Sequence, residues 1–270
     1  MDWSKTKTIF IFTFLLLNVF LSYQLFEKVE NEPRSMEGEA SLEEGIERSN
    51  IEIEAELPDD DIPLFVVSST ILESIPEEME DMYDDEMYSS IDVEDGEVTV
   101  WLDEPFEISE DERWQDIRNF IDNNVYEGED YRYAYTDELQ IEYYWHHQGR
   151  TLIAPEYTHL SLYENEDGDI QSFSQRLVHT ENKEEQSTNS AMEAIEHLIS
   201  EIDITPNSAV THVDHVYYSA LLEEEYEGQQ VLYAPYYRIW VEDPMDDEED
   251  RYADVYMVDA VDGTIVQIRS

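Results

Sequence analysis

Three Asp-Gly pairs constrain the fold of this chain more than any other feature. Asp95-Gly96, Asp167-Gly168 and Asp262-Gly263 each lie between runs rich in β-branched and aromatic residues. Glycine adopts positive φ angles without steric cost and aspartate tolerates them, so this pair is typical of the tight turn between antiparallel strands. The sequence therefore predicts three β-hairpins.

Further strands are expected where aromatic and β-branched residues are enriched. These runs are residues 131–135, 139–147, 209–222 and 232–241. Because 41% of the residues are apolar and 12% are aromatic, the chain can form a packed core despite its many charges.

Two segments show the spacing of amphipathic helices. The segment 109–125 opens with a capping box, Ser109-x-x-Glu112. Its predicted buried face consists of Trp114, Ile117, Ile121 and Val125. The segment 190–202 opens with a second capping box, Ser190-x-x-Glu193, and Pro206 follows its end. Its predicted buried face consists of Ala191, Ile195, Leu198 and Ile202.

A shorter helix is predicted over residues 68–75, where Pro76 would end it. The order of helix, strands and hairpin occurs once before about residue 178 and again after it. We therefore expect an α+β fold that starts near Ile51 and consists of two units, residues 51–178 and 179–270. Each unit would be an antiparallel sheet with a helix on one face.

An apolar run near the N-terminus is long enough to cross a membrane. Residues Thr8 to Phe26 carry no charge over 19 positions. As a helix they would span roughly 28 Å, close to the hydrocarbon thickness of a bilayer. A cleaved signal peptide is normally followed closely by a small-x-small site, but Gly38-Glu39-Ala40 lies far downstream. We interpret the run as an uncleaved signal anchor.

Lys5 and Lys7 set the expected orientation of this anchor. Positive charge on the short N-terminal side places residues 1–7 in the cytoplasm and the rest of the chain outside the cell. Residues 27–50 are rich in Glu, Ser, Gly and Asn, which is typical of a flexible acidic tether. We expect a single-pass protein of the cell membrane with an extracytoplasmic domain.

The charge of this outer domain limits its partners. The chain has 68 acidic and 14 basic residues, and all but one of the acids and two of the bases follow Phe26. Nucleic acids and anionic lipid headgroups bind through Lys and Arg, so both are excluded. The excess favours a surface that stays solvated in salty or alkaline surroundings, with calcium loading as the alternative. The acidic runs 58–63, 81–87 and 243–250 are solvated loops or, alternatively, docking surfaces.

The histidines do not form a metal motif. His212 and His215 flank an aspartate, but in a strand their side chains project to opposite faces, and the adjacent His146 and His147 have the same defect. The segments that precede Gly168 and Gly263 lack the first ligand of a calcium loop, so they are interpreted as turns.

Catalytic motifs are missing as well. The chain has no cysteine, no nucleophile elbow and no glycine-rich phosphate loop, and Glu142 does not belong to a zincin helix motif. A pair of carboxylates carries no information among 68 acids. We expect no catalytic residue, no metal and no cofactor.

The informative polar residues lie in the predicted anchor. Asn18 is at its middle and Ser22 is four residues further on, so both face one side of the helix. Hydrogen bonds between such residues and another span contribute roughly 0.6 kcal/mol on average. Asn18 and Ser22 either mark a face that contacts a second transmembrane helix or are polar residues that a strong anchor tolerates.

Both ends of the chain resemble the YycI (WalI) family of low-GC Gram-positive bacteria. The start "MDWSKTKTIFIFTFLLLNVF" is similar to the short cytoplasmic stub and single span of that family. The C-terminal "VLYAPYYRIWV" and "DVYMVDAVDGTIV" are similar to its closing strands and final hairpin, a pattern shared loosely with PepSY-type modules. The extreme acidity departs from ordinary members.

This resemblance implies a regulator and not an enzyme. Members associate with a companion of similar layout, YycH, and with the sensor histidine kinase YycG (WalK) of the two-component system that governs cell-wall metabolism. By this analogy the span carries much of the kinase contact. The alternative function is a membrane-tethered binder or inhibitor of a secreted hydrolase that would use the PepSY-like C-terminal module.

Overall fold

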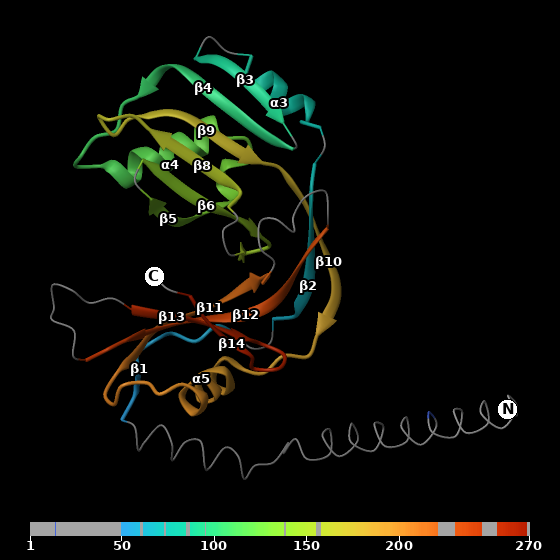
Figure 1. Cartoon of the computed structure of the whole chain (residues 1–270), viewed down its shortest axis with the longest axis vertical. Coiled ribbons are helices and arrows are strands. Elements are labelled where there is room, and N and C mark those ends of the chain that lie inside the picture. The colour runs from blue at the N-terminus through green and yellow to red at the C-terminus, as the bar shows by residue number, and fades with distance from the viewer. Residues whose placement is uncertain are drawn as a thin grey trace, which may run out of the picture. The chain divides into compact units, whose positions relative to one another are not determined.

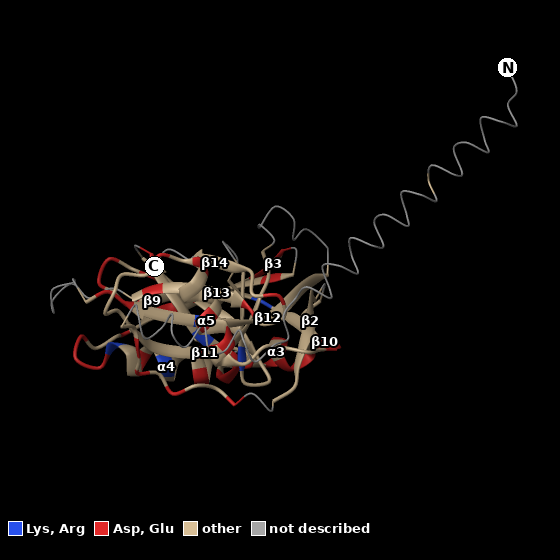
Figure 2. Ribbon diagram, turned by 90° about the horizontal axis from the view of Figure 1, so that it is seen from below, with Lys and Arg blue, Asp and Glu red and all other residues tan. Residues whose placement is uncertain are grey.

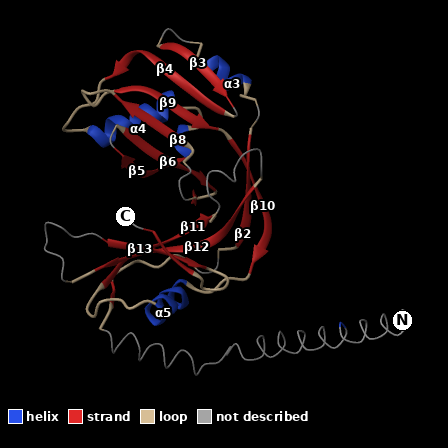
Figure 3. Ribbon diagram, viewed as in Figure 1, coloured by secondary structure: helices blue, strands red, loops and turns tan. Residues whose placement is uncertain are grey.

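β-Strands make up most of the chain, and short helices pack against them (Figures 1 and 3). The computed structural model describes residues 14, 50–59, 62–72, 74–84, 87–94, 96–137, 139–154, 158–220, 230–244 and 253–268. The predicted cytoplasmic stub, anchor and tether therefore lie outside the described residues, apart from Phe14 and Asn50. Among the described residues, no helix has the length and apolar content needed to cross a bilayer.

The strands in chain order are β1 (Glu52–Ile53), β2 (Leu64–Ile71), β3 (Tyr88–Glu94), β4 (Glu97–Phe106), β5 (Tyr131–Asp137), β6 (Gln140–His147), β7 (Arg150–Ile153), β8 (Leu160–Glu164), β9 (Ile170–Arg176), β10 (Val178–Gln186), β11 (Ala209–Tyr218), β12 (Val231–Glu242), β13 (Ala253–Asp259) and β14 (Ile265–Ile268). The described helices are α3 (Glu77–Met82), α4 (Arg113–Asn124), α5 (Ala191–Glu201) and the 3₁₀ turn η1 (Gly128–Asp130). The fold is thus α+β and rich in sheet.

One group of strands forms an antiparallel sheet in the order β5-β6-β8-β9-β4-β3. Helix α4 packs on it through Ile117, Phe120 and Ile121, all fully buried. Their partners in the larger core include Ile141, Leu162 and Phe173 of the strands. Burial of such side chains stabilises the fold by about 1.5 to 3 kcal/mol each.

A second group consists of β1, β11, β12, β13 and β14, and α5 lies on one face of it (Figure 1). The side chains of Ala191, Ile195 and Leu198 contact a separate core that contains Val213 and Ile239. The pairing of β1 with β11 is parallel, whereas the other neighbours are antiparallel.

Strand β7 joins the two groups. It pairs antiparallel with β6 through His146 and Thr151, and parallel with β11 through Leu152 and Tyr217. A second link runs through β2, which pairs with β10 along its length and with the start of β12. From Ile51 onward the chain forms one compact unit.

The predicted hairpins and strands are confirmed. The Asp-Gly pairs fall between β3 and β4, between β8 and β9, and between β13 and β14. The turn before Gly168 is closed by the Asn165 side chain, which accepts hydrogen bonds from the backbone nitrogens of Asp167 and Asp169. The four further runs correspond to β5, β6, β11 and β12.

The helix predicted over residues 68–75 is wrong, because the first half of this segment, residues 68–71, belongs to strand β2. The strand reads LFVVSSTI, and its β-branched residues lie between β10 on one side and β12 on the other. Pairing with two strands satisfies the backbone of the segment, and a helix would forgo it. Pro76 precedes helix α3 and does not end one, consistent with the fixed φ angle of proline at a helix start.

The first predicted capping box does not form. Helix α4 starts at Arg113 with Glu112 at its N-cap, and no side chain caps it. The backbone nitrogen of Ser109 instead donates to Asp116 at 3.0 Å. Trp114, which was expected in the core, is 55% exposed and packs against Tyr133 at a ring-centroid distance of 5.2 Å. Trp114 lies in the first turn, whereas the deeper turns bury Phe120 with Ile117 and Ile121.

The second capping box is confirmed. The side chain of Ser190 accepts from the backbone nitrogen of Glu193, and the Glu193 carboxylate accepts from the backbone nitrogen of Ser190 at 2.6 Å. This exchange satisfies two donors at the start of α5 that have no partner within the helix.

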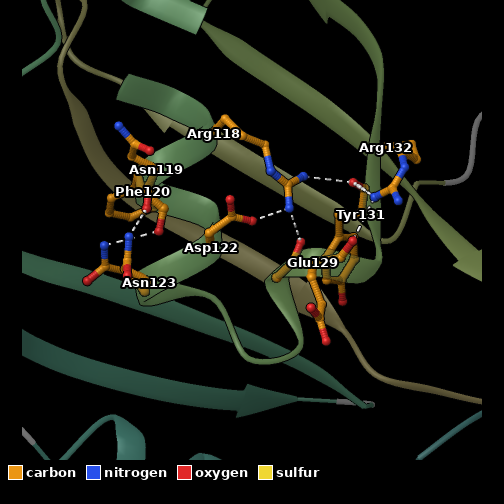
Figure 4. A network of polar contacts seen from close by, with 10 residues as sticks. Arg118, Asn119, Phe120, Asp122, Asn123, Glu129, Tyr131 and Arg132 are labelled. Carbon is orange, nitrogen blue, oxygen red and sulfur yellow. Dashed lines mark hydrogen bonds and ion pairs between the residues drawn. The ribbon is translucent and has the colours of Figure 1, made fainter. Parts of the chain in front are cut away.

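Arginine side chains fix the start of β5 to helix α4 (Figure 4). Arg118 donates to the carbonyl oxygens of Tyr131 and Gly128, both at 3.0 Å, and forms an ion pair with Asp122. Arg132 donates to the same Tyr131 carbonyl at 2.9 Å. Strand β5 pairs only with β6 among the described strands, so these contacts cover part of a sheet edge.

Acidic residues are spread over strands and loops, whereas Lys and Arg occupy few positions (Figure 2). Only a few acids are buried, namely Glu142, Glu164 and Glu196. Most described acids therefore face solvent, and the core consists mainly of apolar and aromatic side chains.

Candidate functional site

The residues predicted to contact a partner or to set the topology are Asn18, Ser22, Lys5 and Lys7, and all lie outside the described residues. The candidate site in the described chain is therefore a different one.

A pocket of about 690 Å³ lies where the two groups of strands meet. Strand β12 covers one edge of β11 over residues 209–218, whereas the other edge has separate partners at its two ends. There β1 pairs with Ala209 and Val210, and β7 pairs with Tyr217 and Tyr218. Between these partners the described chain leaves β11 without a neighbouring strand, and residues 212–215 line the pocket. The pocket is thus a gap in the sheet.

Two further segments complete the wall. The tip of the β6–β7 hairpin contributes Gln148 and Gly149, and the chain that leaves β1 contributes Leu57, Pro58 and Ile62. A tight turn places Gln148 and Gly149 at positive φ, 48° and 84°, so the hairpin reverses directly beside the gap. The lining therefore combines apolar and polar residues.

The histidines divide between the faces of their strands, as the strand pattern predicts. The His212 ring contacts Trp240, whereas the His215 ring contacts Tyr237. Trp240 and Tyr237 are separated by an odd number of positions on β12, so their side chains point to opposite faces of the sheet. His146 lies beside Thr151. In contrast, His147 hydrogen-bonds Thr180 at 2.8 Å and Asn182 at 2.9 Å.

No group of three or more His, Asp or Glu side chains within the described ranges is arranged to hold a metal ion. Glu142, weighed above for a zincin motif, is buried and accepts hydrogen bonds from the hydroxyls of Thr158 and Ser161. These two donors satisfy the carboxylate within the sheet.

Asp214 in the pocket is already neutralised by an arginine. Arg238 binds its carboxylate through two nitrogens, at 3.1 and 2.7 Å, and also lies 4.5 Å from the centre of the Trp240 ring. This bidentate geometry is the strong form of an Arg–carboxylate contact.

Arg150 in the pocket has no such partner. Its side chain is 9% exposed, and its guanidinium carbon lies 5.9 Å from the centre of the Tyr217 ring. None of the ion pairs found between described residues includes Arg150, and its Nε has no hydrogen-bond partner there. The guanidinium is attracted to this ring and also hydrogen-bonds the Tyr217 side chain, whereas its Nε donor stays without a partner among the described residues.

The pocket is electropositive at His146. Burial lowers the pKa of this imidazole to about 4, and the positive charges of Arg132 and Arg150 lower it further than the nearby Asp214 raises it. His146 is therefore neutral at pH 7 and can donate or accept one hydrogen bond per ring nitrogen.

Sequence reasoning identified the pocket histidines but not Arg150, Thr151 or the Gln148-Gly149 turn. The signal was a lone arginine directly after a tight turn, in a chain with only 14 basic residues. Its meaning depends on the lack of an acidic partner among the described residues, which only the packed structure reveals.

Residues 30–261 match the family model described as YycI protein. A search of curated proteins finds no match. Among solved structures, the chain is similar to the crystal structure of an uncharacterized protein from Eubacterium rectale ATCC 33656, with 9% identity and a TM-score of 0.43. That similarity covers 80% of this chain and 90% of the other.

Proposed function

Because the chain belongs to the YycI family, we propose that it is a membrane-anchored accessory regulator of a sensor histidine kinase that controls cell-wall metabolism. Membership implies a role in regulation of the YycFG two-component system, as a membrane-associated accessory protein. The family match, which covers most of the chain, is the observation that carries the proposal.

The N-terminal run supplies the membrane part of this proposal. Thr8 to Phe26 would form the span, and Asn18 and Ser22 would mark the side that contacts the kinase or a YycH-like companion. Asn18 and Ser22 lie on one side of this helix and would orient it, because each gains a hydrogen bond only when a partner faces it.

The proposed mechanism is a shift of population. Packing of this span favours one arrangement of the transmembrane helices of the kinase, and the outer domain changes that packing in response to external conditions. A coupling free energy of about 1 to 3 kcal/mol changes the output 5- to 150-fold.

The test is a pull-down from membranes of the native host. The native chain is compared with a variant in which residues 8–26 are replaced by an unrelated span. We expect a histidine kinase and a second single-span protein to co-purify with the native chain and to be lost with the replacement. Unchanged partners, or secreted hydrolases in their place, would contradict the proposal and support the tethered hydrolase binder.

Point variants then locate the contact. Asn18→Leu should reduce kinase recovery, whereas Thr13→Val removes a polar group five residues away and on a different side of the helix. Equal recovery with both variants would show that Asn18 is only a tolerated residue.

A further inference from the structure

The gap along β11 has the dimensions and chemistry of a ligand pocket. Its volume of about 690 Å³ is in the range of small-molecule sites. It lies at the junction of two sheets, where pockets commonly occur. Its lining combines apolar side chains, Leu57, Pro58 and Ile62, with a few polar groups.

Among the residues that line the pocket, Arg150 is a buried charge with no carboxylate partner among the described residues. A buried guanidinium without a carboxylate is costly, because desolvation of a charge is normally offset by a paired charge or hydrogen bonds. This chain has 68 acidic residues to choose from. The described acids nearest in the pocket do not serve it, since Asp214 is bound by Arg238 and Glu56 is exposed to solvent.

The charges around His146 include two arginines and one aspartate. Burial is the main cause of the lowered pKa of His146, and among the charges Arg132 lowers this pKa more than Asp214 raises it, with a further lowering from Arg150. Positive charge at this point in a chain of net charge −54 favours an anion as the ligand of the pocket.

We propose that this pocket binds a small organic monocarboxylate, with the carboxylate on Arg150 and the apolar body against Leu57, Pro58 and Ile62. The guanidinium presents donors in a fork that matches two carboxylate oxygens. Neutral His146 and the Thr151 hydroxyl supply further hydrogen bonds at the same wall. A single negative charge is preferred over a phosphate dianion, because the acidic chain repels each added charge.

Acetate is the simplest probe of this site, and acetamide is its neutral counterpart. The full-length protein in detergent is labelled with ¹³C in its histidine rings, and its NMR signals are followed at constant ionic strength and pH 7. We expect saturable shifts of pocket histidine signals with acetate, with a dissociation constant on the order of 1 mM for so small a ligand. Acetamide should produce no saturable shift, and inorganic phosphate should bind more weakly than acetate.

Two variants test the assignment to Arg150. Arg150→Gln should raise the dissociation constant at least tenfold. Because removal of a buried arginine can disturb folding, a second variant is Gln148→Glu at the hairpin tip. The new side chain has nearly the same shape as Gln but carries a negative charge. It should weaken acetate binding several-fold. Gln115→Glu makes the same change at an exposed position of α4, outside the pocket, and should leave binding unchanged.

Three results would overturn the proposal. These are the absence of a saturable response to acetate, an equal response to acetamide, and equal affinities for Gln148→Glu and Gln115→Glu. Phosphate binding tighter than acetate would overturn the preference for a monocarboxylate. The kinase plays no part in this measurement, so its outcome is separate from that of the membrane pull-down.

Discussion

Arg113 of helix α4 donates to both carboxylate oxygens of Glu164 on strand β8, each at 2.7 Å. The Glu164 side chain is 4% exposed, whereas that of Arg113 is 33% exposed. The contact therefore places a buried negative charge under a partly solvated positive one. It also fixes the start of α4 to the end of β8, an interior strand of the sheet on which the helix packs.

Removal of Arg113 should destabilise the fold more than removal of an exposed cation. Arg113→Ala leaves the Glu164 carboxylate buried without its charged partner, and we expect a loss of about 2 kcal/mol in the free energy of unfolding. Lys183→Ala, which breaks the exposed pair with Glu181, should have a much smaller effect, because solvent screens that pair. Urea denaturation followed by tryptophan fluorescence measures both values, and equal losses would contradict the buried pair.

The two predicted capping boxes provide a matched comparison. Ser190→Ala removes the side chain that caps α5 and should lower stability by about 1 kcal/mol. Ser109→Ala changes the same residue type in the same sequence pattern, but that box does not form, so we expect a change below about 0.5 kcal/mol. The same urea titration distinguishes them. A larger effect at Ser109 would show that α4 starts earlier than the structure places it.

His159 should make the stability of the fold depend on pH even above the pH range in which carboxylates titrate. It is buried, and its Nδ1 accepts a hydrogen bond from the Trp145 backbone nitrogen at 3.1 Å. Burial, with a smaller contribution from the charge of Arg176, lowers its pKa from 6.5 to about 3. As the pH falls below 6.5 the unfolded chain binds a proton that the folded chain does not. Stability therefore declines by up to about 1.4 kcal/mol per pH unit until the folded value is reached.

His159→Gln keeps an acceptor for the Trp145 nitrogen but does not titrate. We expect the slope of unfolding free energy against pH, measured between pH 6.5 and 5, to decrease by up to about 1 kcal/mol per pH unit. A slope identical to that of the native chain would show that His159 is protonated in the folded state or exposed to solvent.

Two glycines at positive φ should respond differently to a methyl group. A Cβ on Gly96 would lie 2.2 Å from the Ile71 Cγ2 and 2.9 Å from the Leu72 carbonyl oxygen, whereas a Cβ on Gly149 meets nothing within 4 Å. Both alanine variants carry the backbone strain of positive φ, about 1 kcal/mol. Gly96→Ala adds a steric cost of about 1 to 3 kcal/mol, because the β3–β4 turn packs on the end of β2. Thermal or urea unfolding of the two variants measures this difference, and equal losses would contradict that packing.

Local patterns were sufficient to predict the features that depend on a few neighbouring residues. Asp-Gly turns, strands rich in aromatic residues and the Ser190 capping box all follow from backbone preferences that act over about four residues. The same patterns misassigned residues 68–75 and Ser109. At residues 68–75, pairing with strands β10 and β12, which are distant in sequence, changed the balance. At Ser109 the competing partner was the side chain of Asp116 in the first turn of α4.

The sequence by itself determined the antiparallel hairpins, the start of α5, the excess of negative charge and the family resemblance. Only the tertiary structure decided that Trp114 of α4 is exposed, that β7 joins two sheets, and that Arg150 in the gap along β11 has no acidic partner among the described residues. The physical reason is range. Turn and cap energies are set by adjacent residues, whereas the burial of a charge depends on which strands meet around it.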